Sequence, residues 1–130
     1  MKFISIEGAK PNPGHYSPAV QKGNLLFISG QLPVNPFTGE GVQGDITEQT
    51  NQVLENLSTI LEAAGAKKDD VMKVTVFISD IELWGTVNSI YSQYFGEHKP
   101  ARSVVPTNEL HYGFKIELEA IAFIDDVKED

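Results

Sequence analysis

Arg102 and Glu117 lie near the C-terminal end of the sequence, and their side chains could do anion and acid–base chemistry. The planar guanidinium of an arginine can bind a carboxylate through two parallel hydrogen bonds. A glutamate enclosed at a subunit boundary can transfer a proton. Taken singly, neither residue is diagnostic. The excess of acids favours a structural salt bridge for Arg102, and a solvated strand face is the simpler reading of Glu117 and its neighbour Glu119.

Asn88 is a polar residue inside an apolar helical stripe. At helical spacing its neighbours are Trp84, Val87, Tyr91 and Phe95. A polar side chain in such a place needs a hydrogen-bond partner. A satisfied buried amide is the favoured interpretation, and a place beside a ligand pocket is the alternative.

Two further patterns could indicate a binding site, but their surroundings in the sequence argue against it. The segment 39–44 matches G-x-G-x-x-G, but a turn precedes it where a dinucleotide loop requires a buried strand. His15, His98 and His111 share no metal-ligand spacing, and the chain has no cysteine. We therefore expect neither a metal nor a bound dinucleotide.

The composition narrows the class of protein. With 130 residues the chain has room for one core, so we expect a single domain over 1–130. A net charge of −8 makes nucleic acid and anionic membrane surfaces unlikely partners. Because no long apolar run follows the N-terminus, we expect no signal peptide or membrane span and a cytoplasmic protein.

Hydrophobic periodicity predicts alternating strands and helices. Strands are expected at 2–6, 25–29, 71–79, 101–106 and 114–124, and amphipathic helices at 45–64 and 80–95. On the third strand we expect Met72, Val74, Val76 and Ile78 to share one side. The fold class is therefore α+β, a single mixed sheet with two helices on one face.

The other face of this sheet is expected to be semi-polar. On the last strand it carries Lys115, Glu117, Glu119, Ile121 and Phe123. No predicted helix remains to cover that face. Subunit contact and closure into an oligomer are the hypothesis that follows.

Several sequence blocks, taken together, resemble the Rid family of YjgF-type reactive intermediate deaminases, also called RidA. The blocks read LFISGQLPVNP at 26–36, EAAG at 62–65, VTVF at 74–77, PARS at 100–103 and IELEAIA at 116–122. They follow the family's order and span roughly Phe3 to Phe123.

The resemblance implies a fold, an assembly and a reaction. The fold would be chorismate-mutase-like, assembled as a homotrimer with clefts between subunits. Active members hydrolyse 2-imino or enamine acids to 2-keto acids and ammonia without a cofactor. Rival readings are a trimeric ligand-binding or regulatory protein and, less favoured because of the charge of −8, a ribonuclease or translation inhibitor.

The resemblance also implies roles for individual residues. Arg102 would hold the substrate carboxylate, and Glu117 would position and deprotonate the attacking water. The backbone carbonyl of Val104 would help to hold that water. The remaining substrate-binding positions are Tyr16, Ser29, Gly30 and Asn88.

The segment 105–113 departs from the family pattern and leaves the substrate preference open. His111 and Tyr112 within it could project near the cleft mouth or form a turn, and we favour the turn.

Overall fold

The computed structural model describes residues 1–125. In chain order its strands and α-helices are β1 (Lys2–Ile4), β2 (Ala19–Lys22), β3 (Leu25–Gln31), α1 (Ile46–Ala63), β4 (Val71–Ile78), α2 (Trp84–Phe95), β5 (Ala101–Pro106) and β6 (Ile116–Phe123). None of the helices among these residues is long and apolar enough to cross a membrane.

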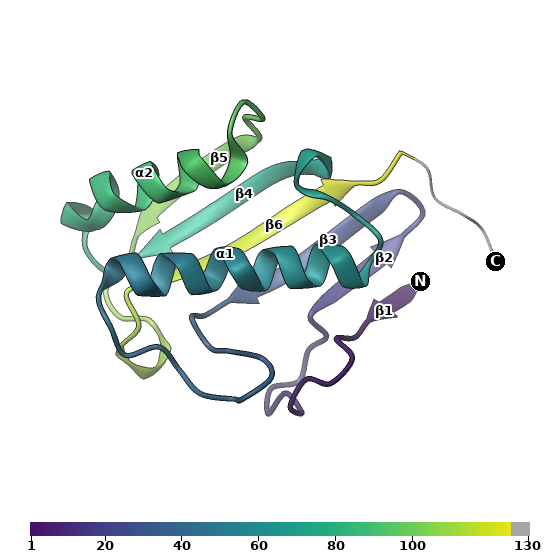
Figure 1. Ribbon diagram of the computed structural model, residues 1–130, viewed down its shortest axis with the longest axis horizontal. Coiled ribbons are helices and arrows are strands. Elements are labelled where there is room, and N and C mark those ends of the chain that lie inside the picture. The colour runs from purple at the N-terminus through teal and green to yellow at the C-terminus, as the bar shows by residue number, and fades with distance from the viewer. Residues whose placement is uncertain (126–130) are drawn as a thin grey trace.

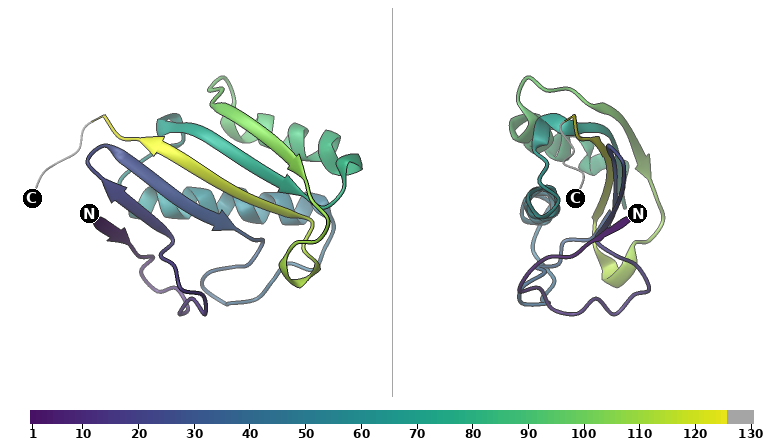
Figure 2. Two further views of the ribbon diagram at one scale, coloured as in Figure 1. Left: turned by 180° about the vertical axis from the view of Figure 1, so that it is seen from behind. Right: turned by 90° about the vertical axis from the view of Figure 1, so that its right-hand side faces the viewer.

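One six-stranded sheet runs in the order β1-β2-β3-β6-β4-β5. Strands β4 and β5 are parallel, and the other neighbouring strands are antiparallel. Both helices lie on the same face of this sheet (Figures 1 and 2). The predicted α+β class, a single mixed sheet with two helices on one face, is confirmed.

The predicted helix ends are set by local capping. The Asp45 side chain accepts a hydrogen bond from the Glu48 amide at the start of α1. Gly65 adopts a φ of +74° after the last turn, a conformation that costs glycine little. Asp80 caps a short 3-10 turn that leads into α2, and Gly96, with a φ of +64°, follows its end.

Strand β2 was not predicted from the sequence. It has four residues, and of these only Ala19 is fully buried. So short a strand with one small buried side chain gives no clear alternation of apolar and polar residues. Its pairing with β3 places it in the sheet.

The expected position of Met72 on the buried side of β4 is wrong. The register between β4 and β6 shifts between Val71 and Lys73, which marks a β-bulge. Val71 is buried instead, and Met72 is 47% exposed. Val74, Val76 and Ile78 are buried as expected.

The predicted alternation along β6 is confirmed. Ile116, Leu118, Ala120 and Ala122 are buried beneath the helices. Glu117 and Glu119 therefore point to the opposite, open face of the sheet, which Figure 2 shows from behind.

Asn56 links α1 to the loop that follows β3. It is 3% exposed, and its amide donates to the carbonyls of Leu32 (3.1 Å) and Val34 (2.9 Å). The Asn56 amide thus supplies the hydrogen-bond donor for two backbone carbonyls of a segment outside the helices and strands. This contact fixes the loop that continues into one wall of the cleft described below.

Replacing Asn56 with alanine should lower the free energy of unfolding by about 2 kcal/mol, because buried carbonyls lose their donor. Urea unfolding measures the change. Asn51→Ala, at an exposed asparagine of the same helix, is the matched control and should change stability by less than about 0.5 kcal/mol. Equal effects of the two substitutions would contradict the anchoring role of Asn56.

Candidate active site

A cleft of about 830 Å³ opens at one end of the sheet, between the N-terminal segment, the loop after β3 and the turn before β6. It brings together four of the residues predicted for the site: Tyr16, Ser29, Gly30 and Glu117. The cleft is large enough for a small organic acid.

Gly30 is what allows the Glu117 carboxylate to reach the backbone of β3. A β-carbon at position 30 would clash with Glu117 Oε2. The register between β3 and β6 also shifts here, between Ile28 and Gln31. Glycine at position 30 therefore allows a close approach of the Glu117 side chain to the backbone of β3.

The neighbouring Ser29 hydroxyl donates to the Ser17 carbonyl at 2.6 Å, which ties β3 to the segment that carries Tyr16.

Glu117 is a half-buried carboxyl with a shifted proton affinity. Burial raises its pKa above the ordinary value, because the charged form loses hydration. The positive charge of His111 opposes this shift, and the negative charge of Glu119 adds to it. A carboxylate with a raised pKa is a better proton acceptor.

Arg102 lies on the helix side of β5, away from this cleft. Its guanidinium stacks 4.7 Å from the ring centroids of Trp84 and of Tyr91, both on α2. Nη1 donates to Asn88 Oδ1 at 3.0 Å. Within residues 1–125 Arg102 forms no salt bridge with a carboxylate, so the salt bridge that composition favoured is not found there.

These contacts hold the guanidinium by aromatic faces and by one neutral amide, which neutralise none of its charge. The side-chain oxygen of the partly buried Asn88 thus has a hydrogen-bond partner, the arginine, and its place beside a ligand pocket stays a prediction. The remaining guanidinium N–H groups are suited to an incoming anion.

Val104 lies two residues further along β5, on the strand that ends the sheet. The Thr107 amide donates to the Ile78 carbonyl of β4. Because amide groups alternate in direction along a parallel strand, those of Val104 point away from β4, toward the free edge. Its carbonyl is therefore available to a ligand or to another chain.

One chain does not bring the two halves of the predicted site together. Arg102 is in register with Val74 and through it with Ala120, whose side chain is buried under the helices. Glu117 is in register with Phe77 on the opposite face. Arg102 and Asn88 thus form one group, and Tyr16, Ser29, Gly30 and Glu117 form another, with the sheet between them.

His111 and Tyr112 both form a turn and line the cleft. They belong to a 3-10 turn, His111–Gly113, as favoured from the sequence, and both lie in the cleft wall near Glu117. The sequence analysis treated a turn and a place near the cleft mouth as alternatives, and the structure shows both together.

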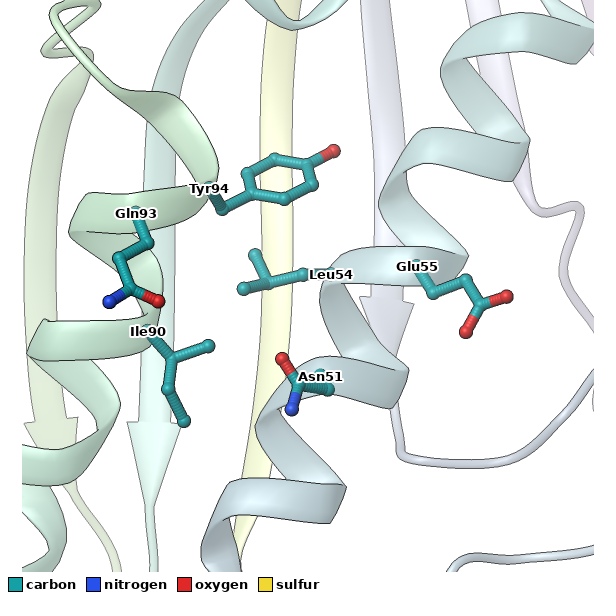
Figure 3. A pocket seen from close by; sticks show the side chains of 6 residues that line it. All are labelled: Asn51, Leu54, Glu55, Ile90, Gln93 and Tyr94. Carbon is teal, nitrogen blue, oxygen red and sulfur yellow. The ribbon is translucent and has the colours of Figure 1, made fainter.

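A second hollow of about 410 Å³ lies between the two helices (Figure 3). Its walls are formed by Asn51, Leu54 and Glu55 of α1 and by Ile90, Gln93 and Tyr94 of α2. It contains none of the predicted site residues. Within residues 1–125 no cluster of three or more histidine or carboxylate side chains could hold a metal ion.

The fold and the cleft define a small α+β protein whose open sheet face carries a half-buried glutamate in a cleft. Residues 8–124 match the model of the endoribonuclease L-PSP family. The chain belongs to this family, which is the family of the YjgF and Rid proteins, so the resemblance found in the sequence is confirmed.

Two relatives illustrate the similarity in sequence. A RutC family protein of Pyrococcus horikoshii is 50% identical over 124 residues, covering 95% of this chain and 98% of the relative. The 2-iminobutanoate/2-iminopropanoate deaminase of Escherichia coli is 46% identical over 124 residues, covering 93% and 96%.

Solved structures agree with the fold. The YjgF gene product of Escherichia coli superposes with a TM-score of 0.87 at 44% identity, covering 95% of this chain and 98% of that one. Escherichia coli TdcF with bound serine gives a TM-score of 0.88 at 40% identity, with coverage of 95% and 98%. The chain has the chorismate-mutase-like fold of the YjgF proteins.

Proposed function

We propose that the protein hydrolyses 2-imino and enamine acids to 2-keto acids and ammonia without a cofactor. The observation that carries this proposal is the Arg102 guanidinium, which stacks on two rings and bonds Asn88 without a carboxylate partner in residues 1–125. In a chain of net charge −8, an arginine kept clear of carboxylates is a receptor for the carboxylate of a substrate.

The chemistry requires a base and a positioned water. Glu117 accepts a proton from water while the water oxygen forms a bond to the electrophilic imine carbon. The imine nitrogen takes this proton, which gives the neutral carbinolamine. Glu117 then transfers the hydroxyl proton of the carbinolamine to its nitrogen, the C=O bond forms as the C–N bond breaks, and ammonia leaves. The carbonyl that remains belongs to the 2-keto acid, and Glu117 is returned to its ionised form.

The two halves of the site require a second copy of the chain, because Arg102 and Glu117 lie on opposite faces of one sheet. We propose a homotrimer in which the β5 edge of one subunit, with Arg102, Asn88 and the Val104 carbonyl, approaches the Glu117 cleft of its neighbour. Large side chains exposed on the open face support this contact: Phe27 is 48%, Phe123 41% and Val105 38% exposed.

The second candidate is a trimeric protein that binds a small molecule without turnover. It is favoured by one observation, the serine bound to the related TdcF. Ribonuclease activity is suggested by the name of the matching family model, but the net charge of −8 disfavours binding to a phosphate backbone.

Turnover separates these candidates. With freshly generated 2-iminobutyrate or 2-iminopropionate, the protein should release ammonia and the keto acid faster than buffer alone. Release at the buffer rate, together with measurable binding of a 2-keto acid, would establish the binding protein instead.

Replacing Arg102 with lysine should lower kcat/KM for an imino acid by about 10- to 100-fold, because the charge remains but the planar fork is lost. The thermal unfolding midpoint should stay close to that of the wild type. Activity near that of the wild type would remove Arg102 from the site.

Replacing Glu117 with glutamine should lower kcat by about 100-fold or more, because the amide cannot accept a proton. Glu119→Gln, on the same face of β6, is the matched control and should cost far less at neutral pH. Loss of activity in Glu119→Gln alone would shift the assignment by two residues. Full activity in both variants would exclude a carboxylate base.

A further inference from the structure

We infer that Asn12 is a positioning residue of the Glu117 cleft, whose side chain closes the loop 12–16 and holds the Tyr16 ring in the cleft wall for substrate binding. This inference rests on the proposed function and deepens it, since it assigns a role at the same site to a residue outside the predicted set.

Both polar groups of the Asn12 side chain bind the backbone of this loop. The Gly14 amide donates to Asn12 Oδ1 at 2.9 Å, which forms an Asx turn. Asn12 Nδ2 donates to the Tyr16 carbonyl at 3.2 Å. One side chain therefore fixes both the turn and the backbone of the residue that carries the ring.

The Tyr16 ring lies against Gly14 within this closed loop. A β-carbon at position 14 would clash with Cδ1 and Cε1 of the ring, so glycine is what allows the ring to lie there. Tyr16 is 55% exposed and lines the Glu117 cleft. A side chain with so much exposed surface gains little from core packing. Its position therefore depends on the loop backbone that Asn12 holds.

The loop is attached to the rest of the protein on both sides of these contacts. Before it, the Lys10 amide donates to the Pro36 carbonyl at 2.8 Å, which joins the N-terminal segment to the loop after β3 (Figure 1). After it, the Ser29 hydroxyl donates to the Ser17 carbonyl. Because residues 5–18 belong to none of the helices and strands, side-chain contacts such as those of Asn12 take the place of regular backbone pairing around Tyr16.

The position of Tyr16 can be measured without turnover, from the NMR shifts of the Gly14 α-protons in the intact protein. The ring current of Tyr16 displaces an α-proton that lies against the ring, and Tyr16→Ala gives the shift without the ring. In Asn12→Ala the displacement should shrink toward the value in Tyr16→Ala. Asn35→Ala is the matched control, because it removes a similar contact, to the Phe37 amide, elsewhere in the cleft wall. It should leave the displacement unchanged.

The kinetic readout separates positioning from a merely structural role. In Asn12→Ala the KM for 2-iminobutyrate should rise about 3- to 10-fold while kcat stays within about twofold, because Asn12 acts through a binding residue and not through Glu117. In a Tyr16→Ala background the same substitution should raise KM no further, since the residue through which Asn12 acts is already gone.

An unchanged Gly14 shift in Asn12→Ala overturns the inference. So does a further rise of KM in the Tyr16→Ala background, which would mean that Asn12 acts independently of Tyr16. A lost displacement with an unchanged KM overturns the role in substrate binding. A lost displacement in a protein without turnover would support the positioning of Tyr16 and overturn the proposed function.

Discussion

The alternation of side chains across a β-sheet is the constraint on which the rest of the structure depends. It places Arg102 beneath α2 and Glu117 on the open face, so these two side chains of one chain cannot reach the same small molecule. The proposed site needs both groups, and the proposed homotrimer would supply the second group from another copy of the chain. In that trimer the uncovered sheet face and the free β5 edge would each form one wall of a shared cleft.

In each half of the predicted site, the surrounding residues leave one charged group able to interact with a ligand. The Arg102 guanidinium is supported by two rings and an amide that leave its charge unneutralised. Glu117, opposite the bare backbone of Gly30, pays a desolvation cost that raises its pKa. The proposed substrate, with a carboxylate and an electrophilic carbon, would bind the Arg102 guanidinium and use the basicity of Glu117. This complementarity supports the proposal of an imino acid, rather than a neutral ligand, as the substrate.

Periodicity and capping were enough to predict most of the fold. Asp45, Gly65 and Asp80 mark their helix ends by local chemistry, and β6 alternates cleanly. Strand β2 was missed because its four residues show no clear alternation of apolar and polar side chains. The bulge at Met72 was missed because it depends on pairing with β6, which is distant in the sequence. The residues of the site were predicted only from the resemblance to the Rid family. The residues alone favoured a salt bridge for Arg102, and no pattern connected His111 with Glu117.

Subunit mixing tests most directly whether the site is shared between two chains. Arg102→Ala and Glu117→Gln proteins, each nearly inactive alone, are unfolded together at equal amounts and refolded. A shared cleft predicts recovery of about a quarter of the wild-type imine hydrolysis, since random mixed trimers each contain one cleft with both native residues. No recovery, in mixed trimers verified by mass spectrometry, would contradict the account, because a site within one chain stays defective in every subunit.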